Sequence, residues 1–128
     1  MKDILLLDTD VLIDYLRNRA EAVNYLENLS QAPIVSAVTV AELYAGVREG
    51  REREILDELI RNSTVIPITE EVAVIGGLYR RDYFKSHGAG LIDAMIAATA
   101  EVEKAIVVTL NRKHFPMFSN VIVPYRKS

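Results

Sequence analysis

The fold class is decided by residues 4–16, which read ILLLDTDVLIDYL. The first four of these residues form a short continuous apolar run, as expected of a strand buried in a parallel sheet. The run stops at residues 8–10, Asp-Thr-Asp, which are residue types that begin helices well. Apolar residues then return at helical spacing. The sequence therefore predicts a buried strand that leads directly into a helix.

The same alternation continues along the rest of the chain. Further short strands are predicted at residues 34–36, 65–66, 106–108 and 121–123, and helices at residues 21–29, 40–48, 51–62, 69–86 and from about residue 93. We expect Thr39 to cap the helix 40–48, with Glu42 at its third position as in a capping box. Strands that alternate with helices form β–α–β units, whose parallel sheet is covered by helices on both faces. The sequence therefore predicts a single three-layer α/β/α domain over residues 1–128, with a short, mostly parallel central sheet.

The composition limits the chemistry that the chain can carry. Half of its 128 residues are hydrophobic and 26% are charged, which is typical of one soluble globular domain. With no cysteine and two histidines, any metal must be held mainly by oxygen. The formal net charge of −3 neither supports nor excludes nucleic-acid binding. Because there is no apolar run of membrane-spanning length and no signal-peptide layout, we expect a cytoplasmic protein with no membrane contact.

Four polar residues lie near the ends of predicted strands or the starts of predicted helices. Asp8 ends the first strand, and Asn111 lies just past the end of the strand 106–108. Glu42 and Asp93 lie near the starts of helices that follow strand-like or glycine-rich segments. Ligands of open parallel sheets bind beyond the carboxyl ends of the strands, and all four side chains can converge there.

A cluster of carboxylates suits a divalent cation. Carboxylates packed together repel one another and take up protons unless a cation neutralises them. Magnesium and manganese prefer oxygen ligands, and two or three carboxylates can anchor such ions while leaving room for a phosphate. Ions of this kind activate water, so no side chain has to act as the nucleophile. The acids therefore favour metal-dependent chemistry on a phosphate ester.

Each of these residues also has an ordinary structural explanation. Asp8 and Asp10 can be explained as helix caps alone, and Glu42 can be explained as the residue that closes a capping box. Asp93 can be an acid stabilised by the start of a helix, and Asn111 is an ordinary turn residue. It is their joint placement at strand ends that favours a site.

Four segments resemble, in order, the four motifs of the PIN-domain family. They are residues 5–12 (LLLDTDVL), residues 39–43 (TVAEL) with Gly46 and Val47, residues 93–100 (DAMIAATA), and residues 108–111 (VTLN) with Phe115. The resemblance covers essentially the whole chain, and four motifs in order are far more specific than any one of them. Within the family, the chain most resembles the VapC-type ribonuclease toxins of prokaryotic toxin–antitoxin pairs, which are small single PIN domains.

The resemblance implies a Mg²⁺- or Mn²⁺-dependent endoribonuclease that hydrolyses RNA phosphodiester bonds, with tRNA a frequent target. It also implies a homodimer and a VapB-type antitoxin that wraps the toxin and blocks its site. The positions that match the family's metal-binding and catalytic acids are Asp8, Glu42 and Asp93. Thr9 and Thr109 match the small polar residues that support the acids.

Two positions depart from the family's pattern. Many members have asparagine where this chain has Asp10, and many have an acid where it has Asn111. We hypothesise that the two changes compensate, with Asp10 restoring the negative charge. Asn111 would keep a catalytic role by offering an amide oxygen or by positioning a water.

Basic residues follow Asn111 directly and are candidates for contact with RNA. They are Arg112, Lys113 and His114. RNA backbones need cations nearby, and these three adjoin the predicted site. A solvated surface face is the alternative explanation.

Three other functions share parts of this pattern. A catalytically silent PIN fold that binds RNA or an antitoxin is the main alternative, because of Asn111. A haloacid-dehalogenase-like phosphatase also opens with paired aspartates, but it needs a lysine and an aspartate pair late in the chain, and the next acid after Asp93 is Glu101. A receiver-type signalling domain needs a phosphate-accepting aspartate after a central strand, and neither the strand 34–36 nor the strand 65–66 is followed by one.

Overall fold

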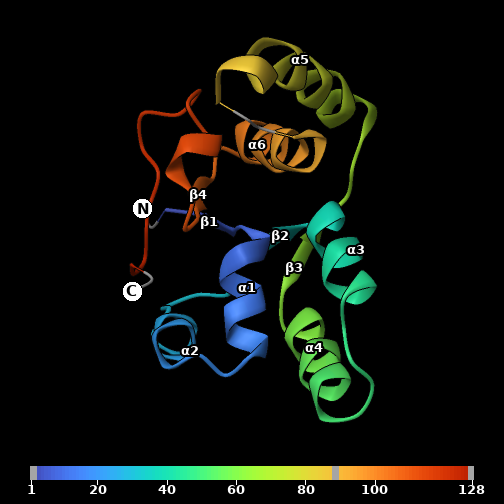
Figure 1. The fold of residues 1–128 in the computed structure, drawn as a ribbon, viewed down its shortest axis with the longest axis vertical. Helices are drawn as coiled ribbons and strands as arrows, with labels where there is room; N and C mark the ends of the chain where they lie inside the picture. The colour runs from blue at the N-terminus through green and yellow to red at the C-terminus, as the bar shows by residue number, and fades with distance from the viewer. Residues whose placement is uncertain (1–2, 88–89, 127–128) are drawn as a thin grey trace.

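A four-stranded parallel sheet forms the centre of the fold. The computed structural model describes residues 3–87 and 90–126. The strand order is β3-β2-β1-β4 (Figure 1), and the strands are β1 (Leu5–Leu7), β2 (Ile34–Ser36), β3 (Thr64–Ile66) and β4 (Ile106–Val108). Leu6 of β1 pairs with Ile34 on one side and with Val107 on the other. The predicted parallel sheet is therefore confirmed, and β1 lies in its interior with β4 beside it.

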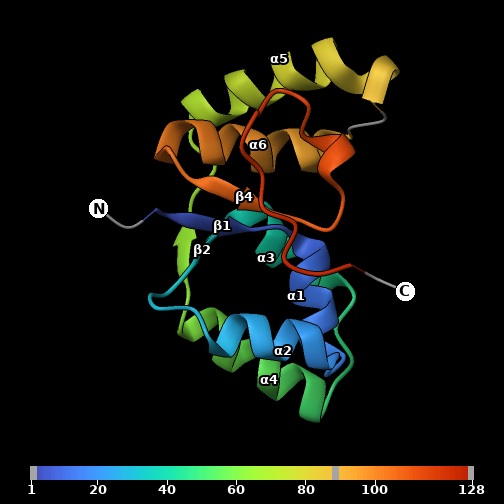
Figure 2. The same ribbon diagram turned by 90° about the vertical axis from the view of Figure 1, so that its left-hand side faces the viewer.

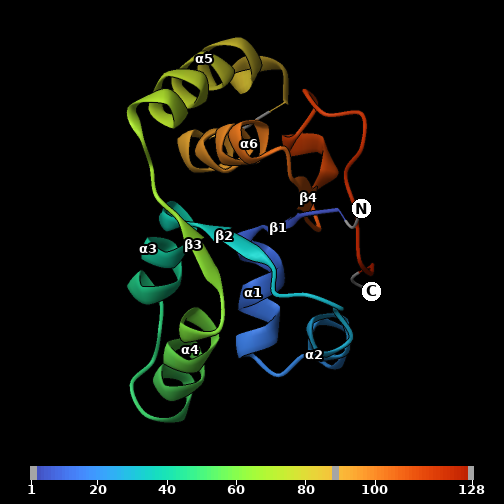
Figure 3. The ribbon, with the colours of Figure 1, turned by 180° about the vertical axis from the view of Figure 1, so that it is seen from behind.

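Six helices in the described ranges cover this sheet. They are α1 (Thr9–Leu16), α2 (Ala20–Glu27), α3 (Ala37–Ala45), α4 (Arg51–Arg61), α5 (Glu70–His87) and α6 (Leu91–Glu103). Helices α5 and α6 lie on one side of the sheet, and α1, α2 and α4 on the other, while α3 follows β2 near the β3 edge (Figures 1 and 3). The view in Figure 2 shows the three layers from the side. This is the three-layer α/β/α arrangement that the sequence predicts.

The apolar run of β1 is continuous because both faces of the strand are buried. Leu6 packs on the α6 side with Ile96 and Phe115, whereas Leu7 packs on the α1 side with Leu12 and Leu56. Because helices cover both faces of β1, this strand needs no alternation with polar residues. In the described part of the chain, no helix combines the length and the apolar character needed to cross a membrane.

Helix α3 begins earlier than predicted. It starts at Ala37, and Ser36 caps it by accepting a hydrogen bond from the Val38 amide at 3.2 Å. Thr39 therefore lies inside the helix, and Glu42 does not close a capping box. The helix ends at Gly46 rather than near residue 48, and Gly50 with its φ of 101° precedes α4. Ser36 is itself a good capping residue at the end of β2, so no linker separates strand and helix.

The prediction of a strand at residues 121–123 is wrong, because no continuous strand forms there. Only an isolated parallel bridge forms there, between Ile122 and Val108. Ile122 donates to the Val107 carbonyl at 3.0 Å and accepts from the Thr109 amide at 2.9 Å. Pro124 has no N–H, so it cannot continue such a ladder.

Candidate active site

Asp8 is the most buried acid of the predicted site. It follows β1 and caps α1, so its Oδ1 accepts a hydrogen bond from the Thr9 amide at 2.8 Å. Its Oδ2 accepts from the Thr109 hydroxyl at 2.7 Å. Thr109 directly follows β4, and the pairing of β1 with β4 brings these two residues together from opposite ends of the chain. The capping role of Asp8 is thus real, and only 6% of its surface is exposed.

Three aspartates surround one another closely enough to repel. Burial and the negative charge of Asp10 raise the pKa of Asp8 to about 7, and the charge of Asp93 adds to this effect. The hydrogen bond from Thr109 acts in the opposite direction, because it stabilises the ionised carboxylate. A bound cation would relieve this repulsion between the carboxylates.

Asp10 reaches across to the loop after β4 instead of serving as a simple helix cap. Its Oδ2 accepts from the Leu110 amide at 3.1 Å. The Thr109 hydroxyl also lies 3.4 Å from this oxygen, but a hydroxyl has one proton, and the shorter contact to Asp8 takes it. Asp10 thus ties the start of α1 to the end of β4.

Glu42 lies on α3 and is held by Thr9. The Thr9 hydroxyl donates to Glu42 Oε1 at 2.7 Å, and it lies 3.1 Å from the Thr39 hydroxyl. Thr9 and Thr39 are both buried, with 7% and 0% of their surface exposed. The predicted supporting position of Thr9 therefore has a clear geometry. Thr39 is a second support, which sequence reasoning took for a helix cap.

Asp93, in the first turn of α6, contacts His114. Its Oδ2 lies 2.9 Å from His114 Nδ1, and each side chain is 25% exposed. The side-chain amide nitrogen of Asn111 lies 3.2 Å from both ring nitrogens of His114. The sequence placed His114 only among RNA contacts. Its contact with Asp93 was missed, because nothing in the local pattern fixes how the short η1 helix (Arg112–His114) turns.

The other two basic candidates lie at the surface. Lys113 is exposed, and Arg112 is exposed while one of its guanidinium nitrogens donates to the Val121 carbonyl at 2.7 Å. Both residues are close to Asn111 along the chain. Contact of these residues with RNA stays a prediction.

The donor set suits a hard divalent cation. Among residues 3–87 and 90–126, no three Asp, Glu or His side chains form a group that could hold a metal ion as it stands. Magnesium usually keeps several waters and needs only one or two direct carboxylates. Asp8 and Asp93 are carboxylates of this kind, and burial, followed by the charges of Asp10 and Asp93, raises the pKa of Asp8. The residues present therefore fit a partly hydrated Mg²⁺ or Mn²⁺.

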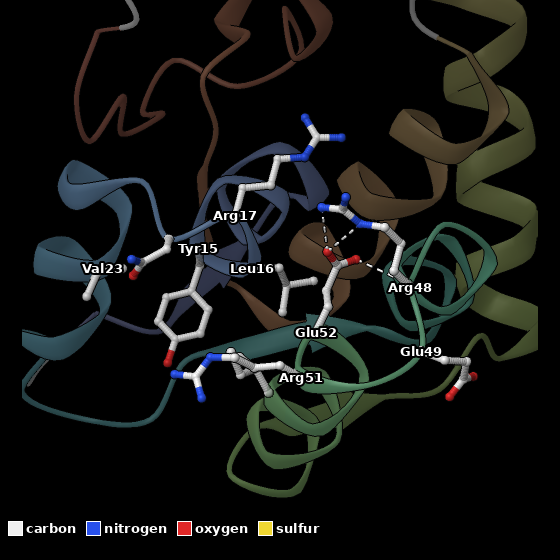
Figure 4. A pocket seen from close by; sticks show the side chains of 10 residues that line it. Tyr15, Leu16, Arg17, Val23, Arg48, Glu49, Arg51 and Glu52 are labelled. Atoms are coloured by element: carbon white, nitrogen blue, oxygen red, sulfur yellow. Dashed lines mark hydrogen bonds and ion pairs between the residues drawn. The ribbon is translucent and has the colours of Figure 1, made fainter.

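The acids do not line the open cavity at the other end of α1. That cavity has a volume of about 680 Å³ and is lined by residues that include Tyr15, Arg17 and Arg51 (Figure 4). Arg48 and Glu52 form an ion pair at its wall, with 3.1 Å between nitrogen and oxygen. A smaller hollow of about 90 Å³ is lined by Glu42 together with Arg17 and Glu52. The cavity is thus a neighbour of the acids rather than part of their site.

The profile of the PIN-domain family matches residues 5–120. The chain belongs to the PIN-domain family. Ribonuclease VapC10 of Mycobacterium tuberculosis is 39% identical to it over 125 residues, which cover 95% of this chain and 93% of the relative. A toxin–antitoxin complex from Klebsiella pneumoniae contains a chain of the same fold, with a TM-score of 0.82, 27% identity, and coverage of 96% and 99%.

A second solved structure agrees. The FitAcB structure from Neisseria gonorrhoeae matches with a TM-score of 0.72 and 31% identity, over 94% of this chain and 98% of the other. The resemblance to VapC-type PIN domains, inferred from the four sequence motifs, is therefore confirmed. With it, the phosphatase and receiver-domain alternatives fall away.

Proposed function

We propose that this protein is a divalent-metal-dependent endoribonuclease, the toxin of a VapBC-type pair, and that it hydrolyses RNA phosphodiester bonds in the cytoplasm. The observation that carries the proposal is the buried Asp8, whose pKa is raised by burial and by the charges of Asp10 and Asp93. A purely structural cap would not require three aspartates in mutual repulsion. The 39% identical relative is named a ribonuclease, and tRNA is the substrate that we propose to test first.

The residues divide the work at the site. Asp8 and Asp93 hold Mg²⁺ or Mn²⁺, and Glu42 completes the acidic set. A bound ion supplies activation of water and stabilisation of the leaving oxygen. Thr109 and Thr9 orient the carboxylates of Asp8 and Glu42 through hydrogen bonds of 2.7 Å each, so these oxygens need no rearrangement when the substrate arrives.

A VapB-type antitoxin is the proposed protein partner. The structural neighbours include complexes of toxin with antitoxin. Beside the cavity of Figure 4, a second one of about 400 Å³ is lined in part by Tyr15, Leu26, Ile55 and Leu59. Apolar residues of α1, α2 and α4 thus form a concave surface, which we assign to an antitoxin segment. The variant Ile55→Asp is expected to weaken copurification with the antitoxin and to leave RNA cleavage intact, because Ile55 lines both cavities.

The active form is proposed to be a homodimer. Helices α5 and α6 expose large apolar side chains, among them Val74 at 56%, Leu78 at 43% and Leu91 at 57%. Val74 and Leu78 are four residues apart on α5, so they share one face of the helix. Sedimentation of the Val74→Glu, Leu78→Glu variant beside the wild type would test the assignment, and an unchanged dimer would contradict it.

The function is tested with purified protein freed from its antitoxin. Total cellular RNA and tRNA are incubated with Mg²⁺, with Mn²⁺ and with chelator, beside the variants Asp8→Asn and Asp93→Asn and the exposed control Asp3→Asn. Discrete fragments that require metal and disappear only in the first two variants would support the proposal. No cleavage of either RNA by folded protein that still binds Mn²⁺ would favour the catalytically silent PIN fold.

A further inference from the structure

His114 and Asn111 form a chain of contacts that ends on Asp93. The Nδ1 atom of His114 lies 2.9 Å from Asp93 Oδ2, a distance at which the ring nitrogen donates to the carboxylate. One oxygen of Asp93, Oδ2, is thus held by the imidazole ring.

Asn111 holds His114 in two ways. Its carbonyl accepts a hydrogen bond from the His114 amide at 3.1 Å. Its side-chain nitrogen lies 3.2 Å from both Nδ1 and Nε2. An approach in the plane of the ring at equal distance from both nitrogens would collide with the carbon between them. The amide therefore packs against a face of the imidazole and fixes the orientation of the ring.

The loop that carries Asn111 and His114 is also joined to the hydrophobic core and to Asp8. Phe115 follows His114 directly and is buried in the core, with 1% of its surface exposed. The backbone amide of Asn111 donates to the Thr109 hydroxyl at 3.0 Å, and the same hydroxyl donates to Asp8. The loop that carries Asn111 is therefore anchored at both ends, and it sets the positions of two acids at once.

We propose that His114 is a positioning residue for Asp93, and that Asn111 acts by bracing His114 rather than as a fourth oxygen ligand. The inference rests on the proposed function, because it concerns how the acids are presented to Mg²⁺ or Mn²⁺. A carboxylate fixed at one oxygen by a rigid donor keeps one orientation, so less conformational entropy is lost when the other oxygen binds a cation. This assignment replaces the ligand role that the sequence suggested for Asn111.

The test is a double-mutant cycle read out as Mn²⁺ binding by calorimetry, without RNA. Loss of an outer-shell partner typically weakens metal binding about 10- to 100-fold, so His114→Ala should weaken it about tenfold or more. Asn111→Ala should weaken it by a smaller factor. Because Asn111 acts through His114, the double variant should bind Mn²⁺ as His114→Ala does, with no further loss. The exposed Asn120→Ala serves as the control and should bind as the wild type.

A matched pair of conservative variants separates positioning from mere folding. His114→Asn places an amide donor near the position of Nδ1, whereas His114→Gln places it farther out, near Nε2. The first should restore most of the Mn²⁺ affinity and the second should not, and both should melt at similar temperatures in chelator. In RNA cleavage, His114→Ala should lower kcat and leave KM nearly unchanged.

Two results would overturn the inference. Mn²⁺ binding by His114→Ala that equals or exceeds the wild type would show that the ring does not help Asp93. An Asn111→Ala effect that persists undiminished in the His114→Ala background would show that Asn111 contacts the ion itself. A wild type that binds Mn²⁺ and cuts no RNA would contradict the proposed function alone, and the binding cycle would still decide the role of His114.

Discussion

Replacing Asp8 by asparagine should stabilise the protein when no metal is present. The Asp8 carboxyl is almost fully buried, and its pKa is about 7 in the folded chain against an ordinary value of 3.8. Between these two values the folded state holds a proton that the unfolded state has released. The contribution of Asp8 to stability therefore falls as the pH rises from about 4 to about 7, and it stays at its lowest value above that range.

The size of the effect follows from the same two values. Each pH unit between them is worth about 1.4 kcal/mol, so ionised Asp8 destabilises the fold by at most about 4 kcal/mol at pH 8 and by about 2 kcal/mol at pH 5. Asparagine removes this penalty and keeps the cap, because its amide oxygen can accept from the Thr9 amide. The Thr109 hydroxyl can rotate and accept from the new amide nitrogen.

The assay is thermal or urea unfolding in chelator at pH 5 and pH 8. At about 4 °C for each kcal/mol, Asp8→Asn should melt up to about 15 °C above the wild type at pH 8, and its advantage should shrink by about 2 kcal/mol at pH 5. The control variant Asp3→Asn should melt at the same temperature as the wild type at both pH values. Added Mn²⁺ should stabilise the wild type and not Asp8→Asn. A variant less stable than the wild type at pH 8, or a stability difference independent of pH, would show that the buried charge of Asp8 does not destabilise the fold.

Three further outcomes are expected. Thr9→Val removes the hydrogen bond to Glu42, so it should lower the free energy of unfolding in urea by about 1 kcal/mol and slow RNA cleavage at least tenfold. Unchanged cleavage would show that Thr9 does not orient Glu42. Thr109→Val removes the bond that favours ionised Asp8, so the pH midpoint of Mn²⁺ binding, measured by calorimetry, should move upward, and a downward shift would contradict the assigned cause. Chelation of a metal-loaded sample should lower the melting temperature of the wild type, and an unchanged melting curve would argue against a resident cation.

Much of the fold could be predicted because its signals are local. The strands at residues 34–36 and 106–108 appear with the predicted bounds, since short apolar runs beside turn or capping residues mark buried strands. The start of α3 could not be settled in this way. Ser36 and Thr39 are both good capping residues, and only the end of β2 decides that Ser36 takes the role.

The candidate site was predictable in its acids and less so in their supports. Asp8 is visible as an acid at the end of a strand, and parallel pairing then brings Thr109 beside it. The contact of His114 with Asp93 and the packing of Asn111 on the ring depend on side-chain positions in a one-turn helix, for which the sequence has no periodic pattern. Those two contacts required the structure.

We propose that the aspartates around Asp8 hold the cation that supports RNA cleavage. The most direct test is to add Mn²⁺ to metal-stripped wild type and to measure, on the same sample, the rise in melting temperature and the rate of RNA cleavage. Cleavage should be absent in chelator, the melting temperature should begin to rise over the Mn²⁺ concentrations at which cleavage appears, and both responses should be lost in Asp8→Asn. Cleavage that persists in chelator, or cleavage by Asp8→Asn at the wild-type rate, would contradict this assignment.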